Sequence, residues 1–223
     1  KQAKSYTVDS LKAAAAALAT NIEFYTMWNH RREAVLHLRS IHVGQEAALL
    51  QEELRLTERA IAENPKSYWV WHHRKWCGEQ FPSLMDWQRE LKLCDKLLER
   101  DARNFHCWTY RRWVGQQAGT VRATELAFTE SKISANLSNY SAWHSRSVLL
   151  ANDISDPDVH TKELELVQQA IVTEPRDSAP WLYVLWLVDS HPPLLDDALR
   201  ITLELLELEP ECKGVCAFCL TSL

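Results

Sequence analysis

The chain has 223 residues, of which 46% are hydrophobic and 25% charged, and its formal net charge is −5. This is the composition of an ordinary globular protein and excludes an intrinsically disordered chain. The acidic balance does not suggest a nucleic-acid-binding protein, which would need a basic face. No run of apolar residues is long enough for a transmembrane helix. Ten residues are Trp, which is many for this length and prompts a search for internal repeats.

A short motif recurs along the chain. Each copy opens on Asn, Asp or Glu and reaches Trp seven positions later, and in the first four copies Arg follows three positions after that Trp. The anchors are Trp28, Trp71, Trp108, Trp143 and Trp181, and a decayed sixth copy has Cys216 in the Trp position. The intervals between the anchors are 43, 37, 35, 38 and 35 residues. Such a period is typical of a solenoid.

Each motif predicts a turn followed by a helix that carries the Trp near its start. Asn, Ser and Asp supply capping oxygens, and Pro is tolerated in the first helical turn. Further helices follow the motifs, because apolar residues recur there three or four positions apart. These stripes are Trp87, Leu91, Cys94 and Leu98, then Leu164, Val167 and Ile171, then Ala198, Ile201, Leu205 and Leu208. No segment has the period of two that marks a strand, so the pattern predicts an all-α chain of antiparallel helical hairpins.

The repeat predicts one domain over residues 1–223, with five full copies and the decayed sixth. One hairpin cannot bury its own apolar face, so each anchor Trp is expected in the core between hairpins. The Arg one turn later is expected to lie along the Trp ring and to donate to the turn of the preceding repeat. The chain begins at Lys1 rather than Met, so we expect residues upstream of it to be missing.

The cysteines and histidines do not predict a metal site. Six irregularly spaced cysteines in a chain of this size indicate buried, reduced thiols in a cytoplasmic protein. His72 and His73 point about 100° apart on a helix and cannot converge on one metal ion. Cys212, Cys216 and Cys219 share a helical face, but no fourth ligand lies near them in the sequence, so we expect them in the core.

The segment from Asn64 to Arg74, Asn-Pro-Lys-Ser-Tyr-Trp-Val-Trp-His-His-Arg, resembles the repeat of protein prenyltransferase α-subunits, and the match extends through all five full copies. Tetratricopeptide repeats, with a period of about 34 residues, lack the Trp-x-x-Arg pattern and fit less well. Residues 103–112, 138–144 and 162–168 resemble the Rab geranylgeranyltransferase (type II) α-subunit most closely. Farnesyl and type I enzymes typically carry Tyr in place of Phe105, and often carry Gln, which helps them recognise a C-terminal carboxylate, in place of Trp69.

The resemblance implies a right-handed superhelix, a crescent of hairpins wrapped around a β-subunit that holds the zinc ion, the isoprenoid and most of the active site. It implies transfer of geranylgeranyl from its diphosphate to C-terminal cysteines of Rab GTPases, which a Rab escort protein presents. This chain would bind no cofactor itself and would be inactive without the β-subunit. The alternatives are a farnesyl or type I α-subunit and a noncatalytic helical-repeat scaffold that binds another protein on its concave face.

Three residues are candidates for the chemistry: Lys66, His106 and Tyr68. The repeat does not require Lys66, because other copies carry Glu23, Arg103, Ser138, Arg176 or Glu211 at that position. From the residues alone, a solvated lysine on a turn is the simpler interpretation. The resemblance implies instead that Lys66 and His106 contact the diphosphate, where cationic and hydrogen-bonding groups stabilise the leaving group. Tyr68 lies near them by the same resemblance, although its position is aromatic in most copies and also serves packing.

Overall fold

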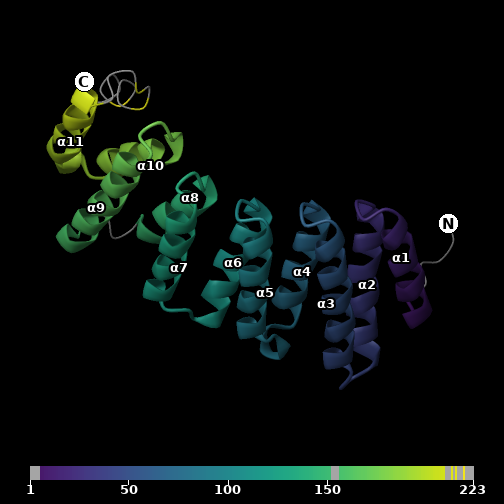
Figure 1. Cartoon of the computed structure of the whole chain (residues 1–223). Coiled ribbons are helices and arrows are strands. Elements are labelled where there is room, and N and C mark those ends of the chain that lie inside the picture. The colour runs from purple at the N-terminus through teal and green to yellow at the C-terminus, as the bar shows by residue number, and fades with distance from the viewer. Residues whose placement is uncertain (1–5, 152–155, 209–211, 213, 215–217, 219–223) are drawn as a thin grey trace. The chain divides into compact units, whose positions relative to one another are not determined.

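The computed structural model describes residues 6–151 and 156–208 and the isolated positions 212, 214 and 218 (Figure 1). All regular elements in these residues are helical, which confirms the predicted all-α class. The α-helices are α1 (Val8–Thr20), α2 (Tyr25–Ile41), α3 (Glu46–Glu63), α4 (Tyr68–Gln80), α5 (Trp87–Arg100), α6 (Phe105–Ala118), α7 (Arg122–Ala135), α8 (Tyr140–Leu150), α9 (Pro157–Thr173), α10 (Ser178–Ser190) and α11 (Leu195–Leu208). Two 3-10 turns, Pro82–Leu84 and Pro192–Leu194, precede α5 and α11. None of the described helices is both long and apolar enough to cross a bilayer.

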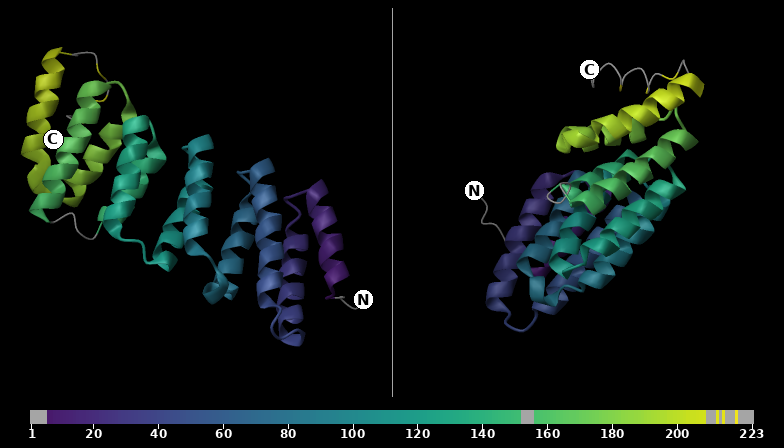
Figure 2. Two further views of the ribbon diagram at one scale, coloured as in Figure 1. Left: turned by 60° about the horizontal axis from the view of Figure 1, so that its bottom comes forward. Right: turned by 90° about the vertical axis from the view of Figure 1, so that its left-hand side faces the viewer.

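The helices pair as antiparallel hairpins, which confirms the predicted architecture. The closest packing joins α1 to α2, α3 to α4, α7 to α8 and α9 to α10, and the two helices of each pair run in opposite directions (Figures 1 and 2). The motif sequence suggests that the Trp-bearing helix comes first in each hairpin, but in the structure it is the second. The turn before the Trp joins the two helices that pack most closely.

By its internal contacts the chain divides into two compact units. The first comprises residues 1–97 and 104–114, and the second comprises residues 98–103 and 115–223. The first unit contains α1 to α4 with most of α5 and α6, and the second contains α7 to α11. The three candidate residues all belong to the first unit, so their arrangement can be described within it.

The anchor tryptophans are buried, as predicted: Trp28, Trp71, Trp108, Trp143 and Trp181. Each indole whose bond is resolved donates from Nε1 to the backbone oxygen six residues earlier, at 2.7–2.8 Å. The indole therefore fills the space between helices and also satisfies a carbonyl of the turn that leads into its own helix. This double role explains why the motif keeps Trp at a constant distance from the turn.

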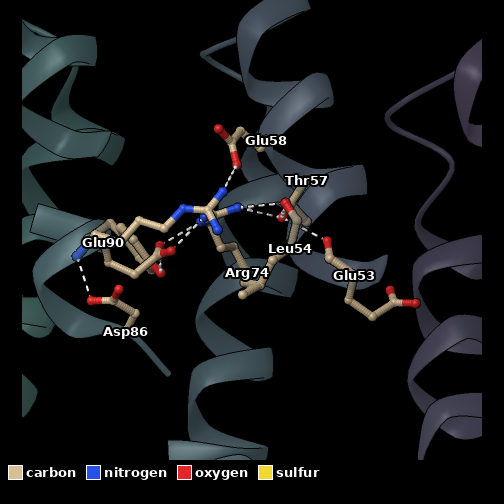
Figure 3. Close-up of polar contacts among 9 residues, drawn as sticks. Glu53, Leu54, Thr57, Glu58, Arg74, Asp86 and Glu90 are labelled. Atoms are coloured by element: carbon tan, nitrogen blue, oxygen red, sulfur yellow. Dashed lines mark hydrogen bonds and ion pairs between the residues drawn. The ribbon is translucent and has the colours of Figure 1, made fainter. Parts of the chain in front are cut away.

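The prediction that each Arg donates to the preceding turn is wrong. Arg74 donates instead to the backbone oxygen of Leu54 at 2.9 Å and to Thr57 Oγ1 at 2.8 Å, both in the middle of α3. On its other side the guanidinium forms two bonds of 2.7 Å to the carboxylate of Glu90 in α5 (Figure 3). The guanidinium therefore lies between α3 and α5 and bonds both helices rather than a turn.

This contact, in which an Arg connects a helix of its own hairpin to a carboxylate of the next hairpin, is called the joint below. It recurs at Arg31 and Arg146. Arg31 bonds the backbone oxygen of Leu11 and the carboxylate of Glu53, and Arg146 bonds Leu126 and Glu163 in the same way. Each carboxylate accepts a further bond from the second helix of its own hairpin, and these donors are His73, Tyr110 and Tyr183. A buried Arg–carboxylate pair with all its groups satisfied therefore connects one hairpin to the next.

Four cysteines are buried as free thiols, which confirms that prediction for Cys77, Cys94, Cys107 and Cys212. Cys216 and Cys219 lie outside the described residues, as does most of the decayed sixth copy. The part of this copy that is described packs on the fifth. Cys212 Sγ donates to the backbone oxygen of Pro175 at 2.9 Å, and the ring of Phe218 lies 6.0 Å from that of Trp181.

Candidate functional site

The turn that presents Lys66 is built by its neighbours. Asn64 Oδ1 accepts a bond of 3.4 Å from the Lys66 N–H, and the Asn64 carbonyl accepts one of 3.2 Å from the Ser67 N–H. These bonds are those of an Asx-type turn, in which the side chain of Asn replaces a backbone acceptor. The Pro65 carbonyl points inward to Trp71 Nε1, while the Lys66 side chain is exposed. The sequence thus places an ammonium group at the outer edge of a well-bonded turn.

His106 lies beside this turn although it comes from the next hairpin. Its ring forms a hydrogen bond with the backbone of Lys66, where the carbonyl oxygen can only accept. Burial lowers the pKa of His106, and this hydrogen bond and the charge of Glu23 oppose the effect only in part. The imidazole is therefore neutral near pH 7, and a neutral imidazole has a single N–H. That N–H is donated to Lys66.

Tyr68 completes the group of candidates. It begins α4, two residues after Lys66, and its ring meets that of His106 edge to face with 5.9 Å between the ring centres. The Tyr68 side chain is 59% exposed, so its hydroxyl is open to a partner or ligand. The structure therefore brings the three predicted residues together at the adjacent ends of α4 and α6.

A groove of about 280 Å³ runs from this group along α4 and α6. Its aromatic walls include Tyr68, Phe105 and Trp113, and its polar groups include His106, His72 and Lys75. Burial lowers the pKa of His72, and the positive charges of Arg32 and Lys75 lower it further. The groove therefore combines apolar surface with two imidazoles and the ammonium of Lys75, which suits an anionic ligand that carries an apolar part.

Two groove residues of α4, His72 and Lys75, were not among the sequence candidates, although their spacing from Tyr68 could have indicated them. His72 and Lys75 follow Tyr68 by four and seven positions, so they lie on the same helical face. His73 points elsewhere, because it is buried against Glu53 with 2.8 Å between its Nε2 and the carboxylate. The two adjacent histidines therefore occupy different surroundings.

The second unit contains the equivalent groove and serves as an internal comparison. This groove of about 270 Å³ lies between α8 and α10 and is lined by Tyr140, Trp143 and His144, which occupy the positions of Tyr68, Trp71 and His72. It has Ser147 in place of Lys75 and Ala179 in place of His106. The repeat alone therefore produces the shape of the groove, whereas Lys75 and the second imidazole are particular to the pair α4 and α6.

Hairpin repeats of this length, with a buried Trp in each and Arg–carboxylate joints between hairpins, define a class of helical-repeat protein. The sequence matches the protein prenyltransferase alpha subunit repeat over residues 8–38, 50–81, 87–118 and 122–153. These ranges correspond to the hairpins α1/α2, α3/α4, α5/α6 and α7/α8. The chain belongs to the protein prenyltransferase α-subunit family.

Its relatives include the type-2 geranylgeranyl transferase subunit alpha of several organisms. The identity is 45% over 204 residues with the rat protein and 44% over 211 residues with the human one. The matched residues cover 86% and 90% of this chain but only 36% and 37% of those relatives, so the chain spans little more than a third of their length. The Dictyostelium discoideum protein is 39% identical over 226 residues, which cover 96% of this chain and 72% of that protein.

One solved structure has the same fold. Candida albicans protein geranylgeranyltransferase-I complexed with GGPP aligns with a TM-score of 0.84 at 24% sequence identity. The alignment covers 98% of this chain and 74% of the matched chain. At this identity the likeness supports the fold and nothing further.

Proposed function

We propose that this chain is the α-subunit of a heterodimeric protein geranylgeranyltransferase of the Rab type. In this proposal the enzyme transfers geranylgeranyl from its diphosphate to C-terminal cysteines of Rab GTPases presented by a Rab escort protein in the cytoplasm. The names of the rat, human and Dictyostelium discoideum relatives support the type. The observation that carries the proposal is the convergence of Lys66, Tyr68 and His106 beside a groove with aromatic walls.

The chain's own residues act on the leaving group. As the cysteine sulfur bonds to C1 of the isoprenoid, the bond from C1 to the diphosphate oxygen breaks and negative charge builds on the diphosphate. Lys66 supplies an ammonium and Tyr68 a hydroxyl donor to that charge. The N–H of neutral His106 is already bonded to Lys66, so His106 contacts the diphosphate through its second nitrogen, which donates once the ring is protonated. An anion bound beside it favours that protonation.

The zinc ion and the isoprenoid pocket belong to the β-subunit in this proposal. Within the described residues, no three His, Cys, Asp or Glu side chains cluster where they could hold a metal ion. Zinc lowers the pKa of a bound thiol and so supplies the nucleophilic thiolate. The α-subunit would then contribute the positive charge of Lys66 beside the diphosphate leaving group.

The test is transfer of labelled geranylgeranyl to a Rab–escort protein complex by this chain co-expressed with candidate β-subunits. We expect transfer that requires both subunits. A farnesyl-type peptide acceptor is assayed in parallel, and transfer to this peptide alone would move the chain to the farnesyl or type I branch. Failure to bind any β-subunit would contradict the proposal and favour the noncatalytic scaffold.

Lys66→Ala tests the leaving-group role. We expect single-turnover transfer to fall on the order of 100-fold, as when a single transition-state donor is removed, with little change in heterodimer affinity. Arg103→Ala is the matched control, because Arg103 occupies the same turn position one repeat later and is also exposed. It should change neither quantity. Equal losses of transfer and assembly in Lys66→Ala would contradict the role.

A further inference from the structure

Asn104 is a buried polar residue that the proposed chemistry does not use. Its side chain is 3% exposed and makes two hydrogen bonds. Oδ1 accepts from the Cys107 N–H at 3.1 Å and so caps α6. Nδ2 donates to the Pro65 oxygen at 2.9 Å, across the joint to the turn that carries Lys66. The Cys107 N–H determines which end of the amide is the acceptor, so the other end must be the donor that the carbonyl needs.

Asn104 and His106 hold two consecutive carbonyls of that turn. Asn104 bonds the oxygen of Pro65, which also accepts from Trp71 Nε1 at 2.8 Å, and His106 bonds the backbone of Lys66. Asn104 precedes α6 and caps it, and His106 lies in the first turn of this helix. The backbone on either side of the Lys66 Cα is therefore tied to the helix that carries His106.

The turn at residues 102–103 is held in the same way by Asn139 and Ser141, but it has neither a lysine nor a histidine. Asn139 Oδ1 caps α8 by accepting from the Ala142 N–H at 3.2 Å, and its Nδ2 donates to the Ala102 oxygen at 3.1 Å. The hydroxyl of Ser141, in the position of His106, lies 3.4 Å from the Arg103 oxygen. The arrangement itself is thus a property of the repeat. Only at residues 65–66 does it position a lysine beside an imidazole.

We propose that Asn104 is a positioning residue for Lys66: its Nδ2–Pro65 bond sets where the ammonium meets the diphosphate. The inference rests on the proposed leaving-group role of Lys66. Asn104 itself touches no substrate. Because a displacement of about 1 Å can cost on the order of 100-fold in rate, loss of one bond at this turn should slow transfer without removing any group that contacts the substrate.

Asn104→Asp removes the donor and leaves the cap. The substitution is isosteric, and Asp is as good an N-cap as Asn. Asp177 already occupies this position in α10, where its Oδ1 accepts from the Ala179 N–H at 2.9 Å. At residue 104 the second carboxylate oxygen would face the Pro65 carbonyl, which cannot donate to it. The turn must then move away, or Lys66 must turn inward to the new charge, and both changes act through Lys66.

The first arm of the experiment is a double-mutant cycle for single-turnover transfer in the heterodimer. Asn104→Asp should slow transfer about 10-fold to 100-fold when Lys66 is present. In the Lys66→Ala background it should slow transfer less than about threefold, because coupled residues are not additive. Asn139→Asp, the matched control, should have little effect in either background. A purely structural loss would be the same with and without Lys66, and that result would overturn the inference.

The second arm needs no substrate. Hydrogen exchange of the Lys66 and Ser67 amides should be faster in Asn104→Asp than in the parent heterodimer, while Asn139→Asp should affect only residues 102–104. Unchanged exchange at residues 66–67 would overturn the inference even if the parent enzyme transfers normally. Absence of transfer by the parent heterodimer, together with faster exchange at residues 66–67, would instead overturn the proposed function and with it the role of Lys66 on which the inference rests.

Discussion

Individual residues in this chain often have a packing role and a hydrogen-bonding role at once. The anchor tryptophans bury an aromatic ring and also donate to a turn carbonyl. The repeat made their burial predictable, because a constant spacing of large aromatic residues has no other simple cause. The hydrogen bond was not predictable, because it depends on where the turn six residues earlier places its carbonyl.

Replacing Trp108 with Ala tests the buried role. Trp108 is 2% exposed, so we expect a loss of about 3–5 kcal/mol in the free energy of unfolding, as for other buried aromatic truncations. Urea denaturation of the purified protein measures the change. Phe105→Ala is the control, since Phe105 lies on the same helix but is 63% exposed, and it should cost less than about 1 kcal/mol. A loss that small for Trp108 would contradict its place in the core.

The candidate residues differ in how far the sequence could identify them. Lys66 and His106 stand out because the repeat does not require them, but only the family resemblance gave them a chemical role. Tyr68 was ambiguous, because aromatic residues occupy its position in most copies. The bond from His106 to the backbone of Lys66 joins two hairpins, and no pattern within one hairpin predicts it.

At the scale of the helices, the joint between hairpins is the main feature that the sequence analysis missed. A signal was available: Glu53, Glu90, Glu125 and Glu163 each precede the next anchor Trp by 18 residues. The regular spacing of a buried carboxylate indicates a buried partner, and the Arg of the preceding motif supplies it at Glu53, Glu90 and Glu163. The prediction for Arg failed because it overlooked this carboxylate, which draws the guanidinium between the helices and away from the turn.

The joint between α1/α2 and α3/α4 contains a titratable histidine, His73. Two other joints have a tyrosine at the same position. His73 bonds Glu53, whereas Tyr110 and Tyr183 make the equivalent bond with their hydroxyls. Burial lowers the pKa of His73, an effect that its bond to Glu53 only partly offsets. Below the ordinary histidine pKa of about 6.5, the unfolded chain therefore takes up a proton that the folded chain does not. Stability is then lost as the pH falls.

We expect His73→Tyr and His73→Gln to reduce the dependence of unfolding free energy on pH between about 7.5 and 5.5. Both substitutions remove the titrating ring, so both should flatten the slope whatever they do to stability at pH 7.5. Urea denaturation at several pH values measures it. A slope identical to that of the parent protein would show that His73 is not held neutral by burial.

At the scale of the whole molecule, each hairpin depends on its sequence neighbours. Within each compact unit the joints connect successive hairpins, so stability should be the sum of hairpin terms and nearest-neighbour terms. A defect in one joint should then weaken the adjacent hairpins more than distant ones. The family match over four successive hairpins agrees with a chain built from one repeating unit.

Arg31→Met tests this behaviour. The substitution leaves the carboxylate of Glu53 without its guanidinium partner at the joint between α1/α2 and α3/α4. We expect faster amide exchange in α1 and α2, a smaller change in α3 and α4, and none in α9 and α10. Arg55→Met, on the exposed face of α3, should leave exchange unchanged. A uniform increase along the chain would show that the chain unfolds as one cooperative unit instead.

The sequence by itself determined the helical class, the hairpin repeat and the burial of the anchor tryptophans, because these follow from spacing along one chain. The family followed from the resemblance of the motif residues. Only the tertiary structure decided which helix is second in each hairpin and how Arg74 connects α3 and α5. It also showed that Asn104 and His106 form hydrogen bonds to the backbone of the turn that carries Lys66. Those features arise where side chains of one hairpin meet carbonyls and carboxylates of another. Spacing within a repeat specifies which groups face outward, but their partners are set by how neighbouring hairpins pack.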